Sequence, residues 1–246
     1  MTDAAAPAVW AELLGLLIRL HDREADAELI AQLRAAEAPA LFDALFAGDD
    51  NGAAAMLAAA LDDLGKAPSA EVLDEMAADF ADLYLTNGHR TAPTGSVWMT
   101  EDHLERQEPM FEVREWYDHY GLKVPNWRVR SDDHLVHELQ FVHHLLAIGT
   151  DDALGDAAHF LDKHVLGWAP EFCDQAAQRV RTQFLAGVAA VTGNFLVAVR
   201  DWLEDETGIA PDIRTNAYAR AQDPAARQLE VKGIQRPFVP GLEPSW

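Results

Sequence analysis

Apolar residues recur three and four positions apart along almost the whole of this 246-residue chain. That spacing places them on one face of an α-helix, whereas a strand would need apolar residues at every second position. Alternation of the strand type, carried by valine, isoleucine and threonine, is nearly absent. The sequence therefore predicts an all-α fold, a single-domain bundle of about ten helices that is long enough to bury a substantial core.

Residues that start and end helices divide this pattern into ten expected helices. Gly121, Gly149 and Gly208 each follow a periodic run, where a left-handed cap favours glycine, and Pro170 suits the first turn of a helix. The last expected helix carries one apolar stripe over residues 172–202 and is the expected core helix. The expected helices are Pro7–His21, Ala25–Ala36, Pro39–Ala47, Gly52–Leu64, Ser69–Leu85, Glu101–Gln107, Phe111–Tyr120, Asp132–Ile148, Asp151–Val165 and Pro170–Glu206.

Two segments fall outside the helical pattern. Residues 86–101, TNGHRTAPTGSVWMTE, form an expected long loop, and ordered loops of this length in compact domains often carry function. Residues 209–246 contain several prolines and no sustained apolar face, which predicts an extended tail. The expected organisation is an all-helical domain at 1–208 followed by this tail at 209–246.

The charge balance limits the expected partners. The chain has 41 Asp+Glu against 19 Lys+Arg, a formal net charge of −22, which repels phosphate backbones and anionic lipid. We therefore expect no nucleic-acid partner. We also expect no membrane insertion, because the apolar N-terminal stretch has a helical period and contains acids. Solubility alone also explains an acidic surface. The single cysteine, Cys173, rules out an internal disulfide and favours a reducing compartment such as the cytoplasm.

The stretch RSDDHLVHELQFVHH packs four histidines and three acids into fifteen residues. If a helix begins here with Ser131 as its N-cap, Asp133 lies four residues before His137, and His134 lies four before Glu138. Each such pair contributes only about 0.2–0.5 kcal/mol to a helix. The pattern is therefore compatible with a helix that binds no ligand.

The common enzyme signatures fail on this chain. A zinc protease needs His-Glu-x-x-His, but the histidine after His137-Glu138 is delayed to His143. A metal phosphohydrolase of the His-Asp type needs an earlier histidine than His21-Asp22, and none exists. Phosphate loops, G-x-S-x-G and dinucleotide fingerprints are absent. We predict no catalytic residue, metal or cofactor, with an all-α metal-dependent hydrolase using histidine and aspartate ligands as the alternative.

Three stretches share their order and spacing with one known family. They are ADFADLYLTNGHRTAPTGSVWMTED, then YDHYGL with SDDHLVHELQFVHHL, then FLDKHVLGWAPEFCDQ with FLAGVAAVTGNFL, over residues from about 73 to 203. Together they resemble the TorD/DmsD/NarJ-like redox-enzyme maturation chaperones. The chain departs from that pattern at Arg130-Ser131, where the family has Glu-Pro, and at Thr94-Gly95, where it often has Trp-Glu.

The resemblance implies a non-enzyme, a cytoplasmic chaperone for one redox system. Such a protein binds the catalytic subunit of a molybdenum-containing oxidoreductase, often through its twin-arginine leader peptide, and assists molybdenum cofactor insertion and assembly before export. The resemblance is compatible with a monomer or a homodimer. A weak nucleotide site has also been suggested in the family, but this sequence contains no phosphate loop. Asp133 is the expected partner of a leader arginine, while core packing remains open for the aromatic candidates. The candidate peptide-binding residues are Asp133, His134, Glu138, Phe80, Leu83, Tyr84, Pro93, Ser96 and Trp98.

Overall fold

The computed structural model of the protein describes residues 6–46 and 52–216. The expected all-α single domain is confirmed, because these residues form eleven α-helices and no named strand. Most of the expected tail, from residue 217 onward, lies outside the described residues. The helices are α1 (Ala6–Asp22), α2 (Ala27–Ala35), α3 (Ala38–Phe46), α4 (Ala53–Asp63), α5 (Ala70–Tyr84), α6 (Gly95–Met99), α7 (Glu108–His119), α8 (Leu135–Ile148), α9 (Asp151–Phe160), which continues as the π-helix η1 (Leu161–Val165), α10 (Ala169–Arg179) and α11 (Gln183–Thr207).

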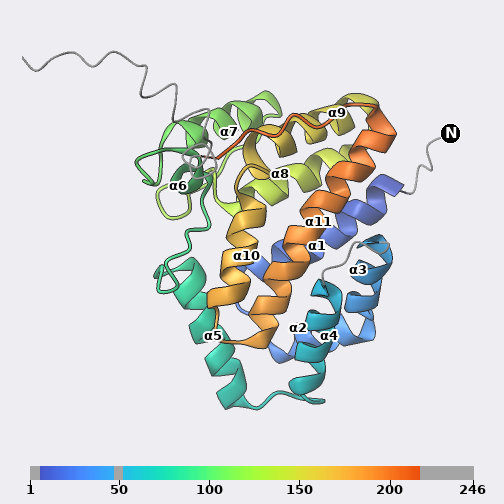
Figure 1. Ribbon diagram of the computed structural model, residues 1–246, viewed down its shortest axis with the longest axis vertical. Coiled ribbons are helices and arrows are strands. Elements are labelled where there is room, and N and C mark those ends of the chain that lie inside the picture. The colour runs from blue at the N-terminus through green and yellow to red at the C-terminus, as the bar shows by residue number, and fades with distance from the viewer. Residues whose placement is uncertain (1–5, 47–51, 217–246) are drawn as a thin grey trace, which may run out of the picture.

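Helix α11 is the centre of the bundle. It runs through the middle of the molecule in Figure 1 and packs against α10, α4, α9 and α3, while α1 packs against α8. The ring of Phe195 on α11 lies 5.4 Å from that of Trp10 on α1 and 6.3 Å from that of Phe42 on α3. One buried apolar cluster extends from α1 to α11, so these helices share a single core.

Helix α11 is long and apolar enough to cross a membrane by length and composition alone. Within its most apolar window, 67% is buried inside the bundle. Core residues of the described chain, such as Val188, Val191 and Val199, account for that apolar composition, since each is almost completely covered by other helices. The central position of α11 therefore explains its composition without a membrane.

The expected single helix Pro170–Glu206 is wrong, because the chain breaks it into the hairpin of α10 and α11. Val180 is extended, with ψ 155°, and ends α10. Asp79 on α5 then accepts hydrogen bonds from the amides of Arg181 and Thr182 at 3.0 and 2.8 Å. The fully buried Asp79 carboxylate thus satisfies amides at the start of α11, a capping role supplied by a distant helix.

Two expected helix positions near the long loop are also wrong. Residues 101–107 form turns and bends, since the segment has no apolar face to bury and its Leu104 is 57% exposed. The short helix of this region is instead α6, inside the expected loop. Helix α8 begins at Leu135 rather than Asp132, because Asp132 and Asp133 form a turn and the extended His134 pairs with Thr94 of the loop.

The residues that follow α11 have no regular structure and lie against the bundle. They contact a buried ion pair in the core of the bundle. Arg200 on α11 makes this two-point ion pair with Asp162 on η1, with N–O distances of 2.8 and 2.9 Å. Asp162 also accepts a hydrogen bond from the Asp212 amide at 2.9 Å. At Gly167 a Cβ atom would overlap the carbonyl oxygen of Arg214, so glycine lets this segment pass close to the bundle.

We predict that Gly187→Ala destabilises the fold. A Cβ atom at Gly187 on α11 would lie 2.9 Å from Cα of Leu57, which belongs to the backbone of α4. Overpacking of this kind costs about 1–3 kcal/mol. Gly155→Ala on α9 is the control, because its Cβ would meet only the side-chain tip of Ile209 at 3.4 Å and helix propensity favours alanine by about 1 kcal/mol. Denaturant unfolding of both variants decides, and equal stabilities would contradict the close crossing.

Candidate functional site

The expected loop and the histidine-rich stretch lie together in the structure. An isolated antiparallel bridge joins Thr94 to His134. Within it, the Gly95 amide donates a hydrogen bond to the carbonyl of Asp133 at 2.8 Å. Two motifs about forty residues apart in the sequence thus form one structural unit at the start of α8.

Asp133 lies inside this unit and is completely buried. Its carboxylate accepts hydrogen bonds from the amide and the hydroxyl of Ser96 at 2.7 and 2.5 Å, and from the Ser131 hydroxyl at 2.5 Å. The Ser96 amide belongs to the first turn of α6, so Asp133 holds that turn against α8. The carboxylate does not face solvent, and its expected pairing with a leader arginine stays a prediction.

His134 is the N-cap of α8, in place of the expected Ser131. Its Nδ1 atom accepts a hydrogen bond from the Val136 amide at 3.1 Å, which leaves Nε2 as the protonated nitrogen of a neutral ring. Burial lowers the pKa of His134 well below its usual value, and the positive charge of Arg130 adds to this effect. His134 therefore presents an N–H donor at neutral pH.

Glu138 and Trp168 form a buried pair behind the loop. The indole Nε1 of Trp168 donates a hydrogen bond to Oε2 of Glu138 at 3.1 Å, and burial raises the pKa of Glu138 well above its usual range. A Cβ atom at Gly95 would lie 3.1 Å from the Trp168 Nε1 atom. Glycine at this loop position therefore leaves room for the tryptophan. Trp168 belongs to a motif of the resemblance but was not among the candidates.

Tyr84 takes part in a buried network that sequence reasoning missed. Its hydroxyl bonds to Nδ1 of His21 on α1, and Nε2 of His21 bonds to the Thr192 hydroxyl on α11 at 2.8 Å. Because the Thr192 hydroxyl donates to the Val188 carbonyl, it accepts from His21, and Tyr84 is the donor to Nδ1. Burial lowers the pKa of His21 from 6.5 to about 4. The network ties α1, α5 and α11 together.

The remaining candidates are mostly packing residues. Leu83 is fully buried, and Phe80 packs on the Tyr84 ring at 4.6 Å. Trp98 is buried, and its indole N–H donates to the Ala92 carbonyl at 2.8 Å, which closes the loop on itself. Pro93 is buried beside them. These side chains shape the region from within, and Tyr84 is partly accessible.

A cavity of about 200 Å³ opens where α5, the loop and the start of α8 meet, and we call it the loop cleft. Two of its residues are strongly exposed apolar side chains, Leu85 at 65% and Val129 at 80%. Of the nine candidates, four line it, and the other five are buried and outside its lining. The residues that line the loop cleft are Leu83, Tyr84, Leu85, Asn87, Ala92, Pro93, Thr94, Glu105, Arg106, Val129, Arg130, Ser131 and His134.

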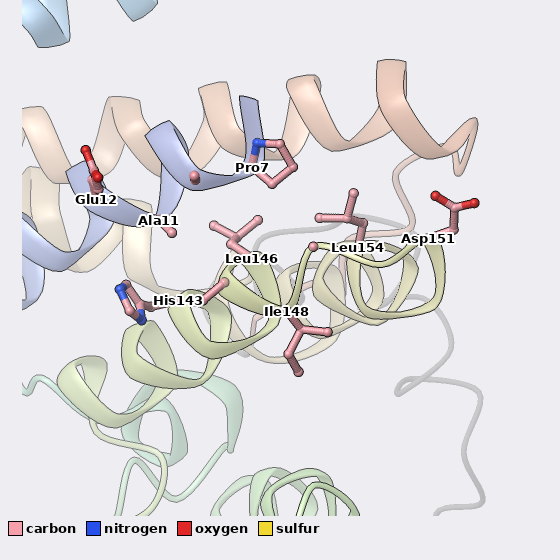
Figure 2. Close-up of a pocket in the computed structure, with 11 residues that line it drawn as sticks. Pro7, Ala11, Glu12, His143, Leu146, Ile148, Asp151 and Leu154 are labelled. Carbon is pink, nitrogen blue, oxygen red and sulfur yellow. The ribbon is translucent and has the colours of Figure 1, made fainter. Parts of the chain in front are cut away.

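Other histidines of the stretch point elsewhere. Figure 2 shows His143 at a pocket of about 520 Å³ between α1 and α8, beside Ala11 and Glu12. His144 packs edge-on against Tyr120, with ring centroids 6.0 Å apart. Within 6–46 and 52–216, no group of three or more histidine, cysteine, aspartate or glutamate side chains is placed to hold a metal ion. His137, His143 and His144 together line another pocket, of about 420 Å³, whereas His134 lines the loop cleft.

We predict that Asp133→Asn lowers the free energy of unfolding by about 1.5–3 kcal/mol, the contribution of hydrogen bonds to a charged group. An amide in this position accepts fewer hydrogen bonds from the serines around it. The matched control is Asp118→Asn at an exposed position of α7, where a change within about 0.5 kcal/mol is expected. Denaturant titrations measure both variants. An Asp133→Asn variant as stable as the wild type would refute the proposed contribution of the Asp133 hydrogen bonds.

We also predict that acid destabilises the fold through His21. Its pKa is about 4 in the folded chain and 6.5 as the reference, so the unfolded chain binds the proton first as the pH falls. Stability is lost from about pH 6.5 down to about pH 4, amounting to about 3 kcal/mol for this residue. The free energy of unfolding, measured across that range, should fall less steeply with decreasing pH in His21→Gln than in the wild type. Parallel curves for the two proteins would contradict the buried neutral ring.

Comparison with known proteins agrees with this geometry. The family model described as nitrate reductase delta subunit matches residues 43–174. The chain is 29% identical over 210 residues to the chaperone protein TorD of a Psychrobacter species, covering 82% of this chain and 94% of that protein. It is 29% identical over 190 residues to TorD of Shewanella loihica, covering 74% and 87%.

A shorter match, to TorD of Vibrio cholerae serotype O1, is 33% identical over 114 residues and spans 42% of this chain and 51% of that protein. The family match covers more than half of the chain and includes both segments that form the loop cleft. The chain therefore belongs to the nitrate reductase delta subunit family, the TorD/NarJ-like family that its motifs resemble.

Proposed function

We propose that the protein is a chaperone dedicated to the catalytic subunit of one molybdenum-containing oxidoreductase. Family membership supports this, as does similarity to chaperone TorD along most of both chains. One structural observation supports the loop cleft as the binding site. The bridge between Thr94 and His134 builds a single cleft from the two segments on which the family resemblance rests.

The loop cleft suits a polypeptide segment with apolar side chains. Leu85 and Val129 extend into solvent at its edge, where an apolar helix or extended strand of a client would cover them. Tyr84 and His134 line its inner wall with polar atoms that orient such a segment. The client region we propose is the leader peptide, which carries a basic pair followed by an apolar stretch.

Charge draws that leader toward the cleft. The chain has a formal net charge of −22, and Glu101 and Asp102 are exposed on the segment that joins α6 to α7, whose exposed Glu105 lines the cleft. Acidic groups at this edge attract the leader arginines over distances of about 8 Å at physiological ionic strength. In this proposal the leader's arginines lie on the acidic edge while its apolar part enters the cleft.

In this role the protein performs no catalysis and needs no cofactor of its own. It holds the catalytic subunit in the cytoplasm, as a monomer or homodimer, until the molybdenum cofactor is inserted and export can follow. Asp133, Ser96 and Glu138 act as positioning residues, because each is buried and fixes the walls of the cleft rather than its surface. The cleft is thereby preformed before the client arrives.

Affinity purification from the native host, followed by mass spectrometry, tests the proposal. We expect the catalytic subunit of a molybdenum oxidoreductase as the specific partner. The double variant Leu85→Ser/Val129→Ser should bind that subunit about tenfold more weakly, because two exposed apolar contacts, each worth about 1 kcal/mol or less, are lost. Leu41→Ser/Val197→Ser is the control, at exposed apolar positions of α3 and α11 that do not line the cleft.

Melting temperatures of both double variants should stay close to the wild type, since none of the four side chains is buried. A specific partner of another protein class would refute the proposed client. Equal losses of binding in the two double variants would refute the cleft as its binding site.

A further inference from the structure

Two arginines line the loop cleft of this strongly acidic chain. Arg106 and Arg130 line it against one carboxylate, that of Glu105. Arg130 is fixed by Asp22, whose carboxylate oxygen lies 2.5 Å from Nη1 and whose carbonyl accepts from Nη2 at 3.1 Å. Nη2 of Arg106 donates to the Arg128 carbonyl at 2.8 Å. Both guanidinium groups have further N–H donors beyond these bonds.

Neutral donors add to this pattern. The ring of His134 has its proton on Nε2, because Nδ1 accepts from the α8 backbone. The hydroxyl of Thr94, a residue only 4% exposed, has no hydrogen-bond partner among the described residues. Thr94 is a residue of the cleft wall. The Thr94 oxygen is itself enclosed, so a ligand group that accepts hydrogen bonds would meet the N–H donors of Arg106 and Arg130 first.

The acids nearest the cleft offer little to a cation. The oxygens of Asp133 bond to Ser96 and Ser131 inside the protein. Glu138 is buried behind the loop, where the raised pKa favours its protonated form. A second cation entering the cleft would meet Arg106 and Arg130, with Glu105 as the one lining carboxylate and the carboxylate of Asp22 already paired with Arg130.

We propose that the loop cleft recognises an aspartate or glutamate side chain of the client polypeptide, next to an apolar residue. The carboxylate pairs with Arg106 and Arg130 and accepts from the neutral donors, while the neighbouring apolar side chain packs on Leu85 and Val129. This inference rests on the proposed function for the identity of the client. It assigns acid recognition to the cleft and leaves the leader arginines to the acidic edge outside it.

Capped model peptides test the inference without a known client. The probes are acetyl-Leu-Asp-Leu-amide and its Asn and Arg analogues, titrated into the nitrogen-15-labelled full chain and followed by amide chemical shifts. We expect the Asp peptide to bind at least about tenfold more tightly than the Asn peptide. Its largest shifts should appear at the amides of Thr94, Ser131 and His134, which line the cleft.

Arg106→Gln provides the protein variant, because Arg106 is exposed and its removal leaves the core intact. It should reduce the affinity for the Asp peptide about fivefold to tenfold and leave the weak binding of the Asn peptide unchanged. Lys66→Gln, an exposed cation between α4 and α5, is the matched control and should change neither affinity. Preserved amide spectra in both variants establish that the fold is unchanged.

Equal affinities for the Asp and Asn peptides, or tighter binding of the Arg peptide, would overturn acid recognition. The proposed chaperone function would survive that result if a molybdenum oxidoreductase subunit still purifies with the protein. Conversely, selective binding of the Asp peptide together with purification of an unrelated partner would keep the cleft chemistry and reject the client. The two proposals therefore fail separately.

Discussion

The buried carboxylate of Asp133 joins the two halves of the candidate site. Burying a charge costs several kcal/mol unless hydrogen bonds replace its water shell, and here Ser96 and Ser131 supply three. The Ser96 hydroxyl also accepts from the Gln107 amide at 3.1 Å, so the same residue holds the chain on both sides of α6. A segment with little regular structure is thereby made rigid. The position of the loop-cleft walls depends on these hydrogen bonds between Asp133 and the two serines.

Sequence periodicity predicted most of the helices because each buries one apolar face, and that face is a local property. It missed the break between α10 and α11 because the cap comes from Asp79, a residue about one hundred positions away whose neighbours give no local sign of it. It misplaced a helix at 101–107, where charged residues favoured helix but Leu104 had nothing to pack on. Tertiary contacts decided both cases against local preference.

The candidate site was predictable as a region and less so as a set of roles. The resemblance brought the loop and the start of α8 together, and the bridge at Thr94 and His134 joins them. Reading Asp133 as part of a helix made it look exposed, whereas it lies in a turn before α8 and its carboxylate bonds inward to Ser96. His21 was missed, although it continues the buried stripe of Leu14 and Leu17 on α1 and could have been found from that spacing.

The distribution of charge separates attraction from recognition. A net charge of −22 produces a field that draws basic segments to the surface and raises the rate of encounter. Near the cleft, however, the buried acids are already engaged within the protein, since Arg114 holds Asp132 at 2.8 Å, Ser96 and Ser131 bond to Asp133, and burial favours the protonated form of Glu138. Arg106 and Arg130 then offer N–H donors at short range, Arg130 while paired with Asp22. A client would be attracted by its basic residues and selected inside the cleft by its acidic and apolar ones, so both charge types in one segment are needed for tight binding.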